Sequence, residues 1–473
     1  MTVAVTPVPF DRAALRPRIL HIGFGAFARA HPMVYLNQGL GVAGGDWGVV
    51  AARLNSGAEA LSDLDAADGL YHVAEADGET MALRQIGVLC GTCHPARDGA
   101  EALPDLIASP ELSLILLTIT EKGYCTRGGA LDMDHGAIQA DLAGTKPPQT
   151  AIGVIVAGLE RRRASGGEGL TILSCDNQPD NGALTRAAVL GFARARGGDL
   201  ADWIEREVRF PSSMVDRIVP AMTDESRALI SESLGHDDGN AILCEPFRQW
   251  VIEDNFVGQP PPFAEGGALL VPDVQPFEDM KLRLLNGAHT TLAWVGQLLG
   301  QETVSDCMGN APLRRAIRQL MLREQAPTLH LPKDVDVTAY ADDLLSRFGN
   351  TRLKHQLAQI ATDSSQKMPQ RLFSPIGANL QAGRPWPVSA LAIAAWIAGL
   401  RHLEPIDDPR RDELRQAASG ADPVAAIFGL PDLGPAELIE NVAFTDRVRD
   451  VFNQIQESGI AHALDMIVTE PRA

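Results

Sequence analysis

Residues 18–28 read Arg18-Ile-Leu-His-Ile22-Gly23-Phe-Gly25-Ala-Phe-Ala28, an apolar run that leads into two glycines and then into a helical segment. The order strand, glycine turn, helix is typical of a dinucleotide-binding unit, and G-x-G-x-x-A is a variant of its fingerprint. Gly23 permits a tight turn, and Gly25 lets the backbone approach a pyrophosphate. The helix N-terminus offers free N–H groups to that anion. The stretch therefore predicts a nucleotide-binding fold.

Coenzyme contacts are expected along this turn and at the ends of the neighbouring strands. A carboxylate after the second strand would select NAD through the ribose, whereas an arginine there would accept the 2′-phosphate of NADP. Arg53 occupies that region, followed by Asn55 and then Glu59. We expect NAD as the coenzyme, and NADP stays open. The residues assigned to coenzyme binding are Gly23, Phe24, Gly25, Ala26, Phe27, Arg53, Thr120, Glu121 and Lys122.

Short apolar runs alternate with helical stretches through the first half of the chain. Strands are expected at residues 18–22, 47–52, 112–120 and 170–175, and helices at 150–165 and 183–196. Because these runs are continuously apolar rather than alternating with polar residues, they indicate a parallel sheet that is covered on both faces.

After about residue 280, helical periodicity replaces the strand signals. Helices are expected within residues 281–299, 311–324, 337–347 and 388–400, and the last of these is apolar enough to be a buried helix. We therefore expect an α/β, Rossmann-like NAD(P)-binding domain over residues 1–279. A mainly α-helical substrate-binding domain is expected over residues 280–473, with a cleft between the two.

The composition narrows the class of protein. The chain has 473 residues, 45% hydrophobic and 21% charged, which is ordinary for a folded enzyme. A net charge of −19 makes nucleic acids and anionic membranes poor partners. The N-terminus lacks a basic start followed by a long apolar stretch, and the six cysteines are scattered. We therefore expect a cytoplasmic monomer or small homo-oligomer that acts on a small molecule.

Cys90-Gly-Thr-Cys93-His94 matches the CxxCH signature of covalent haem attachment. That attachment takes place outside the cytoplasm, and the sequence indicates no axial ligand. A structural zinc site would need two further ligands at suitable spacing, and none is evident. We expect neither haem nor a metal.

A lysine on an expected helix is the candidate proton carrier. Lys281 is followed by Asn286 and His289. On an α-helix, His289 would lie about 80° and Asn286 about 140° from Lys281, so that all three fan toward one cleft. Oxidation of an alcohol needs a base for the hydroxyl proton. A lysine serves only where desolvation or a nearby cation lowers its pKa toward neutrality, and an amide can hydrogen-bond the developing alkoxide.

The K-x4-N-x2-H pattern at these three residues resembles the active-site signature of the mannitol dehydrogenase family, the polyol-specific long-chain dehydrogenases. The resemblance extends over most of the chain, including GFGAFARAH (23–31), TITEKGY (118–124), SCDN (174–177), MVDRIVP (214–220) and EPFRQWVIEDN (245–255). It implies a zinc-independent enzyme that transfers a hydride between NAD(P) and a CH–OH group.

The same resemblance implies roles for individual residues. Lys281 would be the general acid/base, Asn177 and Asn286 would form an oxyanion hole, and His289 would hold the substrate. Asp216 would support the site as a polar partner, and Glu278 would act as a proton gate to solvent. Asn177 also follows an expected strand, where open α/β sheets place their sites.

Within the family, the stretch Asp363–Arg371 (DSSQKMPQR) resembles the fructuronate reductase (D-mannonate oxidoreductase) branch, which implies D-fructuronate and D-mannonate as the substrate pair. Cations would neutralise the carboxylate of such a sugar acid. The residues assigned to substrate binding are Lys367, Arg371, Arg248, Lys354 and His355. Mannitol, arabinitol or another polyol is the alternative substrate, and a non-catalytic NAD(H) sensor is the alternative of another class.

Overall fold

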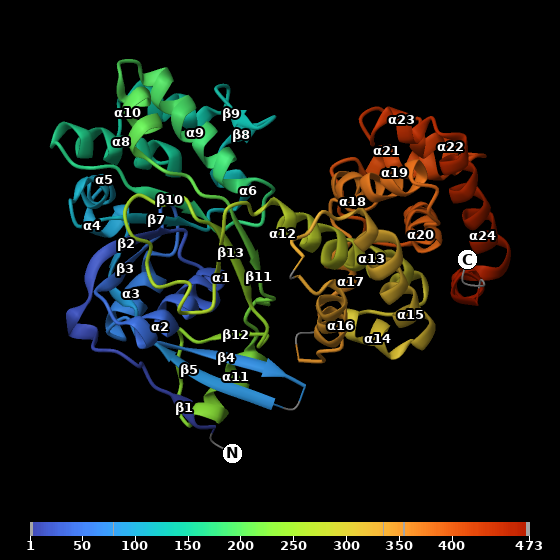
Figure 1. Ribbon diagram of the computed structural model, residues 1–473, viewed down its shortest axis with the longest axis horizontal. Helices are drawn as coiled ribbons and strands as arrows, with labels where there is room; N and C mark the ends of the chain where they lie inside the picture. The colour runs from blue at the N-terminus through green and yellow to red at the C-terminus, as the bar shows by residue number, and fades with distance from the viewer. Residues whose placement is uncertain (1–2, 79, 334, 353–354, 470–473) are drawn as a thin grey trace. The chain divides into compact units, whose positions relative to one another are not determined.

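The computed structural model describes residues 3–78, 80–333, 335–352 and 355–469. The chain forms two compact units, Met1–Gln275 and Pro276–Ala473. Unit 1 ends at Gln275, four residues before the end of the first domain expected from the sequence, at residue 279. Every named strand belongs to the first unit, which runs from blue to green in Figure 1, whereas the second unit is helical.

A five-stranded parallel sheet forms the centre of unit 1. Its strand order is β10-β7-β2-β3-β6. Counted along the chain from β2, this is the 3-2-1-4-5 order of a dinucleotide-binding fold, in which ligands bind where the order reverses. That point lies at the carboxyl ends of β2 and β7. The strands are β2 (Arg16–Ile22), β3 (Trp47–Ala52), β6 (Leu89–Cys93), β7 (Leu114–Leu117) and β10 (Thr171–Ser174).

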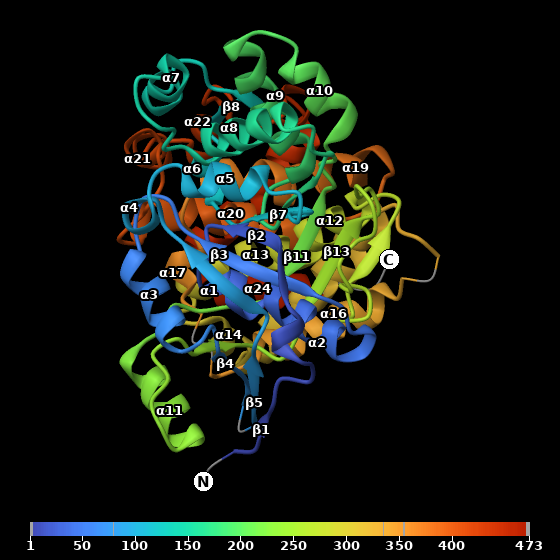
Figure 2. The ribbon, with the colours of Figure 1, turned by 90° about the vertical axis from the view of Figure 1, so that its left-hand side faces the viewer.

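Helices cover both faces of this sheet, as expected from the apolar strands (Figures 1 and 2). Leu20 and Ile22 point into a core with α5 (Ala102–Ala108), α8 (Ala151–Ala164) and α9 (Asn181–Arg196). Ile19 points to the opposite face, into a core with α1 (Ala26–Ala30), α2 (Pro32–Ala43) and α3 (Ala58–Ala66). Alternate residues of one strand thus serve two separate cores.

Besides the β8-β9 pair, unit 1 has two further sheets, neither of which was predicted from the sequence. One has the order β1-β5-β4-β12 and the other β11-β13-β14. Most of their strands are short or joined by long connections and give a weak pattern, whereas β4 and β5 form a hairpin of two seven-residue strands that was missed. They are β1 (Val5–Thr6), β4 (Tyr71–Asp77), β5 (Thr80–Ile86), β12 (Ile242–Cys244), β11 (Ser213–Asp216), β13 (Gln249–Glu253) and β14 (Leu269–Val271).

The remaining elements of unit 1 are short connections and surface helices. They are η1 (Arg12–Ala14), α4 (Pro95–Asp98), α6 (Thr120–Gly123), β8 (Thr126–Arg127), β9 (Ala130–Leu131), α7 (Gly136–Ala143), α10 (Leu200–Glu207) and α11 (Asp224–Leu234).

Unit 2 is built from helices, several of which are continuous with π-helical segments. In chain order they are α12 (Gln275–Met280), η2 (Lys281–Asn286), α13 (Gly287–Leu298), α14 (Val304–Gly309), α15 (Ala311–Gln319), η3 (Leu320–Gln325), η4 (Ala326–Thr328), α16 (Val337–Phe348), α17 (Leu357–Ile360), α18 (Ser364–Met368), η5 (Pro369–Phe373), α19 (Ser374–Gln381), α20 (Pro387–His402), α21 (Arg411–Ala418), α22 (Pro423–Phe428), α23 (Ala436–Ile439) and α24 (Val442–Thr469).

Helix α20 is the centre of unit 2. Residues 388–400 are all buried, which confirms the buried helix expected from the sequence. It packs against α13 and α24. A helix that is apolar all round needs partners on every side, and α20 has them. Along the described ranges, no helix combines the length and the apolar character that a bilayer span requires.

Close packing of α20 leads to a stability prediction. A Cβ added at Gly399 would lie 2.7 Å from Cε3 of Trp294, whereas nothing lies within 4 Å of a Cβ at Gly377 in α19. Gly399→Ala is expected to destabilise the protein by about 1–3 kcal/mol through overpacking. Gly377→Ala is expected to stabilise it by about 0.5–1 kcal/mol. Urea denaturation measures both, and equal effects of the two substitutions would contradict the packing described here.

Candidate active site

The glycine turn of unit 1 lies where the strand order reverses. Gly23 has φ +86°, and a Cβ on it would lie 2.2 Å from the carbonyl oxygen of Thr118 at the end of β7. The Thr118 hydroxyl donates to the Gly23 carbonyl over 2.8 Å. Gly25 has more space, because a Cβ on Gly25 would lie 3.7 Å from the nearest atom, the carbonyl oxygen of Gly23. Gly23 is therefore required by the turn, and the backbone at Gly25 stays open for an anion. This open cradle fits a dinucleotide pyrophosphate.

The other residues assigned to the coenzyme take varied positions. The Phe24 side chain is buried in the core at 2% exposure, which leaves only its backbone for a ligand. Phe27 stacks on His31 at 4.9 Å between ring centroids. Arg53 follows β3 directly and is half-buried. Ala26 begins α1, and the exposed residues Thr120, Glu121 and Lys122 lie on α6.

A carboxylate that the sequence reading did not single out holds the loop after β7 against the end of β10. Asp176 accepts hydrogen bonds from the N–H of Ile119 (2.9 Å), the N–H of Thr120 (3.0 Å) and the hydroxyl of Tyr124 (2.7 Å). Burial raises the pKa of Asp176 despite these donors. Thr120 is held at φ +62°, a left-handed conformation that is costly for threonine. Asp176 thereby fixes the segment that carries Thr120, Glu121 and Lys122.

Asn181 links the two segments that carry Asn177 and Asp216, the polar residues assigned to catalysis in unit 1. Its side chain donates to the carbonyls of Asp176 (2.9 Å) and Ser213 (2.8 Å), and accepts from the Ser213 N–H (2.9 Å). Asn177 follows Asp176 and is exposed, and Asp216 ends the strand that Ser213 begins, at 4% exposure. One buried amide therefore sets the backbone on which both Asn177 and Asp216 stand.

In unit 2, Lys281 and Asn286 are the first and last residues of a π-helix, where the sequence reading assumed α-helical spacing. A π-helix closes i→i+5 bonds, as the Gly287 N–H does to the Leu282 carbonyl. More residues per turn bring Asn286 closer to the Lys281 face than the 140° of an α-helix. Lys281 is buried at 8% exposure, and Glu278 lies three residues earlier on α12. π-Helical turns occur frequently at functional sites.

Three π-helices pack together here, since η2 contacts both η3 and η5. Gly287 lies at the meeting point. A Cβ on it would lie 3.2 Å from Nε2 of Gln325 and 3.3 Å from the carbonyl oxygen of Arg371. The Gln325 amide donates to that carbonyl over 3.4 Å. The absence of a side chain at Gly287 thus lets the helix of Lys281 approach the helix of Arg371.

His289 lies at the centre of a group of basic side chains. Its ring contacts Phe348 (4.6 Å between centroids) and His355 (5.2 Å). Burial holds the pKa of His289 well below its usual value, and nearby His355, Arg371, Arg347 and Lys281 lower it further. Nε2 of His289 is buried and has no hydrogen-bond partner among the described residues. The imidazole is therefore neutral and has an unused polar atom.

Arg371 carries the positive charge beside this imidazole. Burial lowers the pKa of Arg371 to about 10. Its guanidinium donates to the Thr290 hydroxyl over 3.0 Å, and no described carboxylate forms an ion pair with it. His355 is half-buried, with its pKa lowered by burial and with Nδ1 unpartnered within the described ranges. The structure thus brings together Lys281, His289, His355 and Arg371, and adds Arg347, which the sequence reading missed.

Two other cations assigned to substrate binding are engaged in structural contacts. In unit 1, Arg248 lies 3.6 Å from Glu75, bonds Gln38, and covers the Tyr35 ring at 4.9 Å. The Lys367 ammonium donates to the carbonyl (2.5 Å) and hydroxyl (3.2 Å) of Thr362. Their substrate roles stay predictions. Lys354 lies outside the described residues.

The cysteine motif shows no metal-like arrangement. Cys90 and Cys93 both lie on β6, but the Cys90 side chain is exposed and the Cys93 side chain is buried. Nδ1 of His94 accepts from the Ala96 N–H as a helix cap. Within the described part of the chain, no three His, Cys, Asp or Glu side chains gather as a metal site would need.

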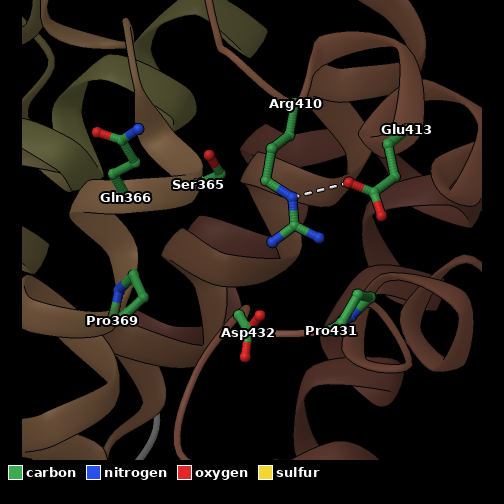
Figure 3. Close-up of a pocket in the computed structure, with 7 residues that line it drawn as sticks. All are labelled: Ser365, Gln366, Pro369, Arg410, Glu413, Pro431 and Asp432. Atoms are coloured by element: carbon green, nitrogen blue, oxygen red, sulfur yellow. Dashed lines mark hydrogen bonds and ion pairs between the residues drawn. The ribbon is translucent and has the colours of Figure 1, made fainter. Parts of the chain in front are cut away.

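A hollow of about 460 Å³ in unit 2 lies beside α18 and η5 (Figure 3). Its Arg410 points toward Glu413 and pairs with it at 2.8 Å. Asp432 also lines the hollow. Its two carboxylates outnumber its one guanidinium, so this hollow is a poorer candidate for an anion than the surroundings of Arg371.

A titration tests the electrostatics around His289. Its imidazole is expected to stay neutral through the range near pH 6.5 in which a free histidine gains a proton. Because its pKa is lowered in the folded state, the associated stability is present above about pH 6.5 and is lost as the pH falls below that value. NMR of ring-labelled histidine, assigned with His289→Asn, measures this. Arg371→Met is expected to raise the pKa of His289, and a midpoint near 6.5 in the unmodified protein would contradict the account.

Comparison with known proteins identifies the family. Residues 17–265 match the mannitol dehydrogenase Rossmann domain, and residues 273–456 match the mannitol dehydrogenase C-terminal domain. The chain is 42% identical to D-mannonate oxidoreductase of Escherichia coli K12, covering 95% of both, and 43% identical to the uncharacterized oxidoreductase YeiQ of the same strain, covering 96% and 95%.

One solved structure is similar to this chain over nearly the whole length of both. It is the ternary complex of Pseudomonas fluorescens mannitol 2-dehydrogenase with NAD and D-mannitol, at 34% identity and a TM-score of 0.85, covering 99% of this chain and 97% of that one. The chain therefore belongs to the mannitol dehydrogenase family of oxidoreductases.

Proposed function

We propose that the protein transfers a hydride between a nicotinamide coenzyme and a sugar acid, and that D-fructuronate and D-mannonate are its substrate pair. The observation that carries this proposal is the guanidinium of Arg371. It lies in the group around Lys281 and His289 without a carboxylate partner among the described residues. A desolvated cation is costly unless an anion accompanies it. The carboxylate of a uronate supplies that anion.

Lys281 moves the proton. During reduction, the ammonium of Lys281 gives a proton to the oxygen at C5 of the hexonate as that carbon receives the hydride, and in the reverse direction the free amine removes the proton. Burial of Lys281 is the condition that favours an uncharged lysine amine. The glycine turn at Gly23 and Gly25 would hold the nicotinamide coenzyme, which would supply or take up the hydride. No metal is needed for this proton transfer.

The remaining polar residues bind and orient the substrate. The amides of Asn286 and Asn177 hydrogen-bond the substrate oxygen as its charge develops. Nε2 of His289 bonds a substrate hydroxyl, which uses the atom that has no partner within the described protein. Asp216 acts as a polar partner of the site, from a strand whose first residue is bonded by Asn181. Glu278, one turn before Lys281, passes the proton to solvent.

Oxidation of mannitol or another polyol is the second candidate. The similar structure named as a mannitol 2-dehydrogenase, bound to NAD and D-mannitol, favours it. The sugar acid is preferred because of the unpaired Arg371 and the 42% identity to a D-mannonate oxidoreductase.

Comparing substrates with and without the charge of Arg371 tests the choice between a sugar acid and a polyol. The protein is expected to reduce D-fructuronate at least about 100-fold more efficiently than D-fructose, in kcat/KM. Arg371→Gln is expected to lower kcat/KM for D-fructuronate by about 10- to 100-fold, because a charge-assisted bond to a carboxylate contributes about 1.5–3 kcal/mol. Its effect on D-fructose is expected to be smaller.

Arg410→Gln is the matched control, since Glu413 already neutralises Arg410 outside the group around His289. It is expected to leave both activities unchanged. A preference for D-fructose or D-arabinitol over D-fructuronate in the unmodified protein would refute the sugar-acid assignment.

A further inference from the structure

We propose that Arg53 makes the coenzyme site one for NADP(H), by binding the 2′-phosphate of its adenosine ribose. The expectation from the sequence named NAD and left NADP open. This inference rests on the nucleotide-binding fold of unit 1 and does not depend on which sugar is the substrate.

The position of Arg53 in the sheet is the first argument. β3 is the neighbour of β2, the strand that leads into the glycine turn, and Arg53 directly follows Ala52 at its end. In this fold, the residue at the end of the second strand contacts the hydroxyls of the adenosine ribose. The backbone N–H of Arg53 donates to the Cys93 carbonyl at the end of β6 over 3.4 Å. The arginine is thereby fixed at the ribose end of the sheet.

The conformation of the side chain is the second argument. Gly57 has φ +82°, and a Cβ on it would lie 2.0 Å from Nη1 and 2.8 Å from Cζ of Arg53. The guanidinium thus lies against the Gly57 backbone, in space that only a glycine leaves open. Gly57 also precedes α3, a nine-residue helix whose N-terminus has no side-chain cap. The guanidinium is therefore held beside further backbone donors.

The absence of a counter-charge is the third argument. Arg53 forms no ion pair and no side-chain hydrogen bond with any residue that the structure describes. Arg97, which follows β6, is the opposite case, because it bonds Asp65 at 2.7 Å and Asp98 at 2.9 Å. Two arginines at one edge of the sheet thus differ in availability, and Arg53 is the one open to a ligand.

The sequence after β3 also lacks the acid that would favour NAD. Residues 53–58 contain no carboxylate, and Glu59 is exposed on α3. A carboxylate at the strand end bonds the 2′-hydroxyl of NAD and repels a 2′-phosphate, whereas a guanidinium grips a phosphate through parallel N–H bonds. On a chain with net charge −19, a further phosphate needs such a cation.

The affinities for NADPH and NADH, measured in the absence of a sugar substrate, test the proposal. Titration calorimetry of the full chain is expected to show NADPH bound at least about tenfold more tightly than NADH. Arg53→Gln is expected to weaken NADPH binding at least about tenfold, or 1.4 kcal/mol, and NADH binding less than about threefold. Arg53→Lys is expected to keep an intermediate preference for NADPH. Added salt is expected to weaken NADPH more than NADH, since charge interactions are screened.

Arg18→Gln is the matched control. It removes one positive charge from the same sheet, but from the amino-terminal part of β2, where Arg18 pairs with Asp46 at 2.7 Å. It is expected to leave the ratio of the two affinities unchanged. Competition by 2′,5′-ADP against 5′-AMP gives a second measurement on the unmodified chain, with 2′,5′-ADP expected to bind more tightly.

Two results would overturn the proposal. One is NADH binding as tightly as NADPH, or more tightly, to the unmodified chain. The other is an equal loss of both coenzymes in Arg53→Gln, which would show stacking of the guanidinium on adenine without recognition of the phosphate. Failure to reduce D-fructuronate would leave these affinities untouched, so the two proposals fail separately.

Discussion

Burial of cationic side chains around one imidazole is the constraint on which the proposed function depends. Lys281, Arg371 and Arg347 all act on His289, whose pKa burial has already lowered. The Arg371 guanidinium is desolvated without an ion-pair partner among the described residues, and holding such a charge away from water is costly. The carboxylate of the sugar acid proposed above would remove part of that cost on binding, so the same charge would also select the substrate.

Packing keeps these groups in place against their repulsion. The π-helical turn of Lys281 and Asn286 meets two further π-helices at Gly287, where the Gln325 amide reaches the Arg371 carbonyl. Unit 1 likewise uses buried hydrogen bonds near its glycine turn. Asp176 fixes the loop after β7, and Asn181 bonds the segments that carry Asn177 and Asp216. In both units, a residue with a structural hydrogen bond determines where a functional neighbour lies.

Local patterns predicted much of the fold and less of the site. The glycine turn and the buried helix α20 follow from short-range rules, because turn chemistry and apolar periodicity are read within a few residues. The π-helical turn at Lys281 was not predicted, since it arises from packing against distant segments. The roles of Asp176 and Arg347 were not predicted for the same reason. Asp176 bonds the Ile119 and Thr120 N–H groups and Arg347 acts on His289, which are all distant in the sequence. Arg248 and Lys367 show the opposite case, in which residues assigned to substrate binding have structural partners. The sequence does not indicate that Arg248 pairs with Glu75 or that Lys367 bonds the Thr362 carbonyl.

The claim that the amine of Lys281 exchanges a proton with the substrate is tested most directly by the pH dependence of kcat/KM in both directions. Alcohol oxidation needs the free amine and carbonyl reduction needs the ammonium, so oxidation is expected to rise with pH and reduction to fall, about one common apparent pKa. Lys281→Ala is expected to lower both rates at least about 1000-fold and to abolish both limbs, whereas Lys146→Ala, at an exposed lysine of unit 1, is expected to change neither. Unchanged pH profiles and near-normal turnover in Lys281→Ala would contradict the account.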